Sequence, residues 1–327
     1  MLTKTDLIVR NFQWSDLPAI VELSNFCQAA DHLEGRSTLA EVENDWRSPL
    51  FTPELECLVV YTPAGQLIAY GTVEKTTINN RAWGEAVVHP DYRGQGIGTH
   101  LLRTGDQNYL DRFADEIDAE TPIYVNRWSP EVLTEAITLL GNEGYFQTRI
   151  FFTMRIQFEG TLAPVAMPEG FRLKPFDPAT DAYKVYQAQQ EAFRDHWGWV
   201  ADLPWEDWQR RLTDPHFDAS LWFIAYEGDE IAGVSLCSDW GEDIPDLAWV
   251  NNLATRRQYR KRGLAQALLE HSFYIFQQRG YHKAGLGVDA ASPTNAVALY
   301  ERAGMHVHKR GLAYRKVLRG NPDLIKE

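Results

Sequence analysis

Residues 253–265 read LATRRQYRKRGLA, which is an apolar strand end, a turn rich in arginine and lysine, and a helix start. Apolar residues recur at close to helical spacing over 263–278 and predict that helix. Its first backbone N–H groups lack partners within the helix and, with the helix dipole, suit an anion such as pyrophosphate. Gly263 and Ala265 have no bulk to hinder the anion, and the basic residues 260–262 add positive charge.

The same turn occurs earlier in the chain. Residues 93–98 read RGQGIG and align with 260–265, RKRGLA, at an offset of 167. Asp31-His32 returns as Asp195-His196 at an offset of 164, and three further landmarks repeat in the same order at offsets of 160 to 164. Chance is a poor explanation for such order, so the chain is predicted to contain two copies of one domain.

The boundary is expected within residues 160–170, which hold two prolines and two glycines with little charge. We therefore predict domains at 1–160 and 168–320. Each copy reads as strand, helix, helix, a meander of strands, the glycine-rich turn with its helix, then strand, helix, strand. This order predicts an α/β (α+β) fold, in which a mixed, mostly antiparallel sheet is flanked by helices.

Particular elements of the second copy can be assigned from pattern. Residues 221–226, 230–238 and 247–254 read as strands, and 263–278 as a helix. The first two strands are joined at Gly228-Asp229, a typical hairpin turn.

Composition narrows the class of function. A net charge of −13 disfavours a nucleic-acid partner. No apolar run approaches the ~20 residues that span a membrane, and the first ten residues lack the order of a secretory signal, so we expect a soluble, cytoplasmic protein. Cys27, Cys57 and Cys237 are widely spaced, which fits reduced packing residues and no metal site.

The turns exclude two familiar nucleotide motifs and resemble a third. No Lys-Ser/Thr pair follows as in a P-loop, and no βαβ unit opens on the turn as in a dinucleotide fold. Residues 87–98, VVHPDYRGQGIG, and 253–265 instead resemble the acyl-CoA-binding motif of the GNAT N-acetyltransferases. Residues 295–305, NAVALYERAGM, resemble that family's second cofactor motif. The tandem order, with FRDHWG at 193–198, is similar to the mycothiol synthase group within the family.

The resemblance implies acetyl-CoA as cofactor and assigns residues to it. Contacts to the pantetheine arm and pyrophosphate fall on Leu253, Ala254, Thr255, Arg260, Lys261, Arg262, Gly263, Leu264, Ala265 and Asn295. In the first copy the same motif covers Val87, Val88, Arg93, Gly94, Gln95, Gly96, Ile97 and Gly98. Tyr300 corresponds to the family's tyrosine that protonates the leaving thiolate.

The first copy differs from the second at the catalytic positions. Aligning Gly144 with Gly304 places Leu140 opposite Tyr300 and Glu135 opposite Asn295. Leucine cannot donate a proton, so we expect the first copy to be catalytically silent. The alignment leaves open whether it still binds acetyl-CoA.

The general base has no motif. Asp246, Glu242 and Asp243 precede the central strand and are candidates, as is His196, which we also assign to acceptor binding with Trp197. Plain solvation of the acids and a structural partnership between Asp195 and His196 are the competing interpretations. Tryptophans 197, 199, 205 and 208 could form a wall of the acceptor site or the core of two short helices, and we expect at least two in the core.

These features favour acetyl transfer to the primary amine of a small metabolite. A protein or peptide N-acetyltransferase and a non-catalytic acetyl-CoA-binding protein are the alternatives. The sequence leaves open a monomer or a homodimer.

Overall fold

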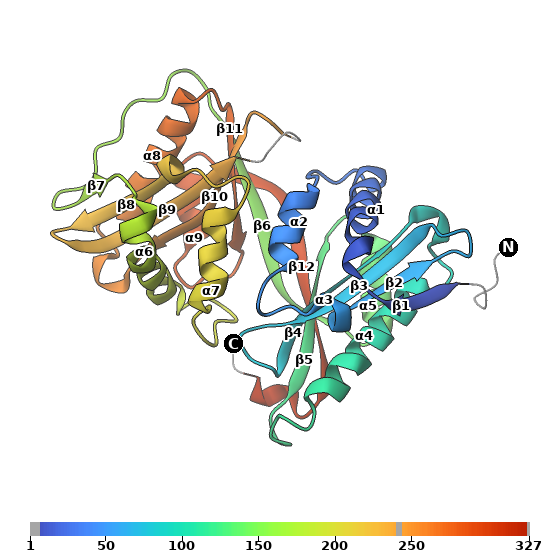
Figure 1. Cartoon of the computed structure of the whole chain (residues 1–327). Coiled ribbons are helices and arrows are strands. Elements are labelled where there is room, and N and C mark those ends of the chain that lie inside the picture. Colours follow the sequence, from blue (N-terminus) through green and yellow to red (C-terminus); the bar gives the residue numbers. More distant parts are fainter. Residues whose placement is uncertain (1–6, 240–243, 326–327) are drawn as a thin grey trace. The chain divides into compact units, whose positions relative to one another are not determined.

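The computed structural model describes residues 7–239 and 244–325 and forms two compact units (Figure 1). The N-terminal unit comprises Met1–Arg149 and Gly311–Lys326, and the C-terminal unit comprises Ile150–Arg310. In the described residues, no helix is both long and apolar enough to cross a bilayer.

The N-terminal unit follows the predicted order of elements. Its helices and strands up to residue 142 are β1 (Ile8–Asn11), α1 (Leu17–Ala30), α2 (Leu39–Trp46), α3 (Pro53–Glu56), β2 (Cys57–Tyr61), β3 (Leu67–Lys75), β4 (Arg81–Val88), α4 (Ile97–Phe113), β5 (Ile123–Pro130) and α5 (Thr134–Asn142). The strand order is β1-β2-β3-β4-β5-β12, where β12 is His306–Arg319.

The C-terminal unit repeats this order. Its elements are β6 (Phe146–Gln157), β7 (Arg172–Lys174), α6 (Pro178–Phe193), α7 (Trp205–Trp208), β8 (Trp222–Glu227), β9 (Glu230–Asp239), β10 (Leu247–Thr255), α8 (Leu264–Gln278), β11 (Lys283–Asp289) and α9 (Ala296–Arg302). The strand order is β6-β11-β10-β9-β8-β7.

The predicted fold class is confirmed. Each unit has a mostly antiparallel sheet with one parallel pair, β4 with β5 and β10 with β11. The assigned strands and helix of the second copy begin and end within one residue of the observed bounds.

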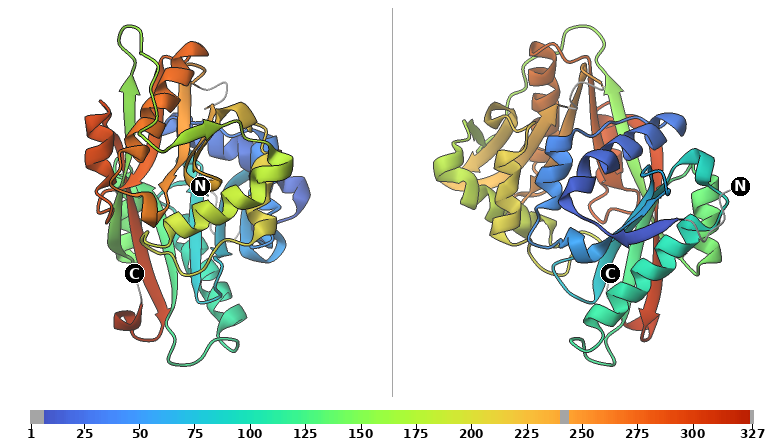
Figure 2. Two further views of the ribbon diagram at one scale, coloured as in Figure 1. Left: turned by 90° about the vertical axis from the view of Figure 1, so that its left-hand side faces the viewer. Right: turned by 45° about the vertical axis from the view of Figure 1, so that its right-hand side comes forward.

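The two sequence repeats exchange their last strands. Strand β6 pairs antiparallel with β11. The pairing begins with Phe151 opposite Asp289 and ends with Gln157 opposite Lys283. Gly311–Arg319 of β12, from the second sequence repeat, pairs with β5 of the first repeat, and both segments belong to the N-terminal unit. Figure 2 shows these two long strands in green and red. The last strand of each sequence repeat thus completes the sheet of the other repeat. A single domain boundary at 160–168 does not describe this exchange of strands.

Two cores lie on opposite faces of the C-terminal sheet. Helix α8 covers the first, which includes Leu268, Phe273 and the β10 residue Val250. Helices α6 and α7 cover the second, which includes the β10 residue Ala254. Of the four tryptophans, Trp205 and Trp208 belong to this second core, as expected for at least two of them. The three cysteines are free and buried.

Candidate active site

Strands β10 and β11 pair only at their beginnings. The parallel register joins Leu247–Trp249 to Lys283–Gly285, and in the described part of the chain it extends no further. Beyond it β10 continues to pair with β9 up to Thr255, and β11 with β6 up to Asp289. We call the region where they no longer pair, residues 250–255 and 286–289, the fork. Backbone groups of β10 that face it are available to a ligand with amide groups.

Two buried polar atoms at the fork support this interpretation. Thr255 Oγ1, at the end of β10, and Asp289 Oδ2, at the end of β11, have no hydrogen-bond partner in the described residues. Buried polar atoms are normally hydrogen-bonded, so each such atom calls for an explanation. A bound chain with hydrogen-bonding groups would satisfy both, which fits the pantetheine arm of acetyl-CoA.

A β-bulge distorts β10 at the fork. The register with β9 shifts between Val250 and Asn252, so Asn251 is the extra residue. Its side chain donates to Ser238 Oγ at 2.8 Å. The corresponding β3–β4 register in the N-terminal unit runs without a shift from Ala69–Val88 to Lys75–Ala82. A bulge reorients the backbone locally and is common beside active sites, and only the C-terminal register shows one.

The turn between β10 and α8 has the geometry of an anion site. Lys261 has a φ of 62° and Gly263 a φ of 79°, which match Gly94 at 72° and Gly96 at 77°. The left-handed conformation costs a lysine ~1–2 kcal/mol that glycine avoids. Helix α8 makes its first backbone bond from Ala267 to Gly263, so the preceding N–H groups remain for an anion.

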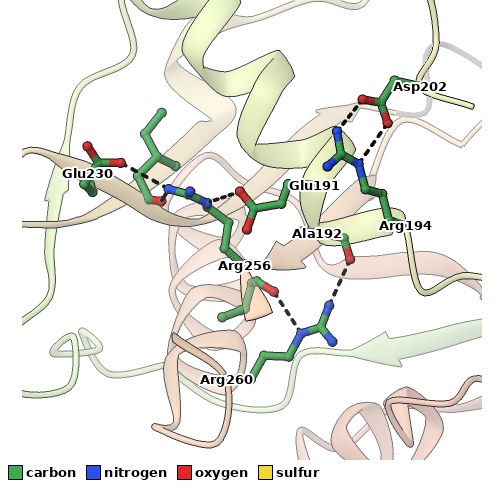
Figure 3. A network of polar contacts seen from close by, with 9 residues as sticks. Glu191, Ala192, Arg194, Asp202, Glu230, Arg256 and Arg260 are labelled. Carbon is green, nitrogen blue, oxygen red and sulfur yellow. Dashed lines mark hydrogen bonds and ion pairs between the residues drawn. The ribbon is translucent and has the colours of Figure 1, made fainter. Parts of the chain in front are cut away.

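Most of the arginines near this turn are engaged by the protein. Figure 3 shows Arg256 held by Glu191 and Glu230, and Arg260 reaching the Ala192 carbonyl at 3.0 Å. Arg260 also donates to the Thr255 carbonyl and pairs with Asp195 at 2.6 Å.

Of the remaining basic residues in the turn, the two arginines are ion-paired and the lysine, in the part of the chain that the structure describes, is not. Arg257 pairs with Asp195, and Arg262 pairs with Glu227 at 2.6 Å. Lys261 is exposed and has no ion pair within residues 7–239 and 244–325. The guanidinium groups therefore mainly shape the turn, and the positive charge left for a ligand is smaller than the sequence suggests.

The turn that follows α6 connects the two ends of the fork. Its Asp195 binds Arg260, while Trp197 packs against Phe151 with 6.1 Å between ring centroids. Phe151 is the cross-strand partner of Asp289. His196 therefore lies in a segment that spans from the end of β10 to the end of β11.

The environment of His196 keeps its imidazole neutral. Burial, followed by the charge of Arg260, lowers its pKa below 6.5, while Asp195 and Asp289 act in the opposite direction. The ring packs against Phe193 at a centroid distance of 4.3 Å. Asp195, which the sequence paired with His196, is bound by arginines instead.

Helix α9 carries Tyr300 and begins after Asn295. Asn295 is exposed with a φ of 55°, and Tyr300 is 8% exposed against the core under α8. Burial raises the pKa of Tyr300 to about 12, so its hydroxyl stays protonated at neutral pH.

The N-terminal unit has leucine at the same structural position. Met305 N donates to the Tyr300 carbonyl at 3.0 Å, and Tyr145 N donates to the Leu140 carbonyl at 3.0 Å. Leu140 is buried in α5, so the alignment made from sequence holds in the structure. The N-terminal strands β4 and β5 also part, after Gly84 and Arg127, before Val87 and Val88 are reached.

The acidic candidates for the base are placed differently. Asp246 lies at the closed end of the β10–β11 pair, 2.9 Å from Lys283 Nζ. Hydrogen bonding to Lys283 lowers the Asp246 pKa, which weakens it as a base. Glu242 and Asp243 lie outside the described residues.

Sequence reasoning missed two residues, Asp289 in the fork and Arg211 beside it. Asp289 ends a parallel strand, a position that often carries functional side chains and could have been noticed. Asn252 follows the bulge and accepts a hydrogen bond from Arg211 at 2.9 Å. Arg211 has no sequence signal, since it lies 41 residues from Asn252 in a short 3-10 helix, Gln209–Thr213.

Comparisons with known proteins identify the family of the chain. Residues 182–305 match the acetyltransferase (GNAT) family model, and residues 53–127 match an acetyltransferase (GNAT) domain model. The chain is 30% identical over 248 residues to a mycothiol acetyltransferase of Thermobispora bispora, covering 71% of this chain and 75% of the relative. A mycothiol acetyltransferase of Geodermatophilus obscurus is 27% identical over 91% of this chain and 93% of its own.

Solved structures give the same result. A GCN5-related N-acetyltransferase from Sphaerobacter thermophilus superposes with a TM-score of 0.78 and 31% identity, covering 99% of both chains. A tandem GNAT protein from the clavulanic acid biosynthesis pathway shares the fold, with a TM-score of 0.69 at 14% identity over 95% of this chain and 98% of that one. This chain belongs to the GNAT acetyltransferase family and is an acetyl-CoA-dependent acyltransferase with two tandem GNAT domains.

Proposed function

We propose that the C-terminal unit transfers the acetyl group of acetyl-CoA to the primary amine of a small metabolite, and that the N-terminal unit is catalytically silent. The observation that carries the proposal is the contrast between Tyr300 and Leu140 at one structural position. Both units keep a turn of the same backbone geometry, but in the described residues only the C-terminal one adds a proton donor and a bulge in the strand that precedes the turn.

The C-terminal unit has groups suited to each part of the cofactor. The turn formed by Lys261, Gly263 and the start of α8 would hold the pyrophosphate through backbone N–H groups. The fork edge of β10 and Thr255 Oγ1 would bind the pantetheine amides. Asn295, at the exposed start of α9, would add a further amide contact.

Proton handling falls to two residues in this proposal. Acetyl-CoA supplies a thioester carbonyl that an amine can attack directly. His196 is neutral and lies at the fork, so it would accept the proton that the ammonium must lose, with Asp289 stabilising the resulting charge. Tyr300 would donate its proton toward the departing thiolate, since it remains protonated until about pH 12.

The names of the relatives support a small acceptor. The proteins from Thermobispora and Geodermatophilus are both named for mycothiol, a small molecule. We extend only the class of acceptor to this chain, in preference to a protein or peptide substrate.

The proposal can be tested by calorimetric titration with acetyl-CoA, followed by a panel of small amines in which release of free CoA is measured. We expect acetyl-CoA to bind and at least one small amine to be acetylated. Binding without turnover of any small amine or peptide would favour a non-catalytic binder, and no binding would refute the proposal.

A further inference from the structure

Arg211 is placed under α6 and α7, on the face of β10 opposite α8. Its Nη1 donates to Asn252 Oδ1 at 2.9 Å and lies 3.4 Å from Gln189 Oε1. Its guanidinium lies 5.9 Å from the ring centroid of Trp208. These contacts fix the side chain, but every hydrogen-bond acceptor among them is a neutral amide.

Arg211 differs in this from the other enclosed arginines. Arg127 of the N-terminal unit is buried and pairs with Asp106 at 2.9 Å, and the neighbouring Arg210 pairs with Asp207 at 3.0 Å. Within the described residues, no carboxylate lies at ion-pair distance from Arg211, and its Nε and Nη2 have no hydrogen-bond partner. Burial lowers the pKa of Arg211, with Asp207 opposing this only from a distance.

A half-buried guanidinium without a counter-charge is destabilising unless an anion binds to it. Its planar group offers parallel N–H donors that match the two oxygens of a carboxylate or phosphate. Nε and Nη2 form such a pair of donors, and these are the two nitrogens left without partners.

The position of Arg211 relates it to the acceptor side of the fork. Asn252 directly follows the bulge and lies on the same face of β10 as Ala254 of the α6–α7 core, whereas α8 covers the other face. With the cofactor held by α8, the attacking amine has to approach from the α6–α7 side, within about 3–3.5 Å of the thioester carbon. An acceptor in that position would bring its remaining groups toward Arg211.

We propose that Arg211 is the anchor of an acceptor subsite and that the amine acetylated by this protein also carries an oxyanion, either a carboxylate or a phosphate. This inference rests on the proposed function, because it names the class of acceptor for that same site.

The experiment compares matched acceptors. Amino acids are assayed against their carboxamides, and amino sugar phosphates against the parent amino sugars, with the natural protein and with Arg211→Gln and Arg211→Lys. We expect kcat/KM to favour the anionic member of the productive pair by roughly tenfold to a hundredfold, and Arg211→Gln to abolish that preference. Arg211→Lys keeps the positive charge but lacks the planar guanidinium group, so this variant should retain only part of the preference for the anionic acceptor.

A control separates specificity from general damage. Arg210→Gln removes the adjacent arginine, which is ion-paired, and should leave the preference intact. The KM for acetyl-CoA should be unchanged in Arg211→Gln if the variant is folded. If neutral amines are acetylated as well as their anionic partners, or if Arg211→Gln lowers all rates equally, the inference is wrong while the proposed function stands.

A binding measurement covers the case in which no amine is acetylated. Acetate and inorganic phosphate are added separately while the thermal unfolding midpoint is followed. A rise in the midpoint for the natural protein and Arg210→Gln, but not for Arg211→Gln, supports the oxyanion subsite even if the transferase proposal has failed. Equal behaviour of all three proteins overturns it.

Discussion

Arg260 Nη1 lies 2.6 Å from Asp195 Oδ2, and this pair ties the phosphate turn to the segment that carries His196. Arg93 and Asp31 form the same pair, also at 2.6 Å, in the N-terminal unit. Since the two pairs occupy equivalent places in the repeats, they offer a matched comparison of structural and functional effects.

Asp195→Asn should weaken both folding and catalysis. The variant leaves Arg257 and Arg260 without their carboxylate, so we expect a loss of ~1–2 kcal/mol in unfolding free energy and a higher KM for acetyl-CoA. Asp31→Asn should lower stability by a similar amount and leave the KM unchanged. Denaturant unfolding and steady-state kinetics check both, and equal kinetic effects would contradict the assignment of catalysis to the C-terminal unit.

His196→Gln should change the pH dependence of kcat/KM. The His196 pKa is lowered by burial, so the folded protein binds fewer protons there than the unfolded chain. The contributions of His196 to stability and activity are therefore complete above pH 6.5 and are lost as the pH falls through the pKa of the folded state. This loss forms the acidic limb of the pH profile. We expect this acidic limb to disappear in the variant, with a rate loss of ~10²–10⁴-fold.

The control for this experiment is His271→Gln. Burial also lowers the pKa of His271, but this residue of α8 packs on Phe223 of β8, away from the fork. The acidic limb should persist in that variant. Persistence of the limb in His196→Gln as well would exclude His196 as the base.

Tyr300→Phe should reduce turnover with little effect on folding. The ring stays in the core, and the lost hydroxyl makes no hydrogen bond within the described residues, so the unfolding free energy should change by less than ~1 kcal/mol. We expect kcat to fall by ~10²-fold or more. Tyr259→Phe, in the same core, should keep full activity. Unchanged turnover in Tyr300→Phe would refute the proposed mechanism.

Fragments of the chain should reflect the strand exchange. Residues 168–320 lack β6, which supplies the fully buried Met154 and covers the edge of β11. An uncovered edge strand invites aggregation, so this fragment should aggregate or unfold at lower denaturant than residues 146–310. Size-exclusion chromatography and urea unfolding compare them, and a stable monomer of 168–320 would contradict the expectation.

Local features were predictable from the sequence because they depend on neighbouring residues. Periodicity located β10 and α8 to within one residue, and the repeat correctly placed Leu140 opposite Tyr300. The conformation of Gly263 also follows from its own residue type.

Long-range pairings were not predictable. Arg260 and Asp195 are 65 residues apart, and nothing in the basic run indicates which arginines are neutralised. The partner of a terminal strand depends on which sheet edge is vacant, so the sequence placed β6 with its own repeat. Arg211 is likewise defined by the absence of a carboxylate in three dimensions, which a sequence pattern does not report.

The most direct test of the central claim is to place one negative charge in each anion-binding turn and measure acetyl transfer. Ala265→Glu alters the start of α8, with Ala265→Gln as the neutral control, and Gln95→Glu alters the N-terminal turn. We expect Ala265→Glu to lower kcat/KM for acetyl-CoA by at least ~10-fold, since like charges in contact cost several kcal/mol, while Ala265→Gln and Gln95→Glu remain near the natural value. Loss of activity in Gln95→Glu with Ala265→Glu intact would show that the chemistry belongs to the N-terminal unit.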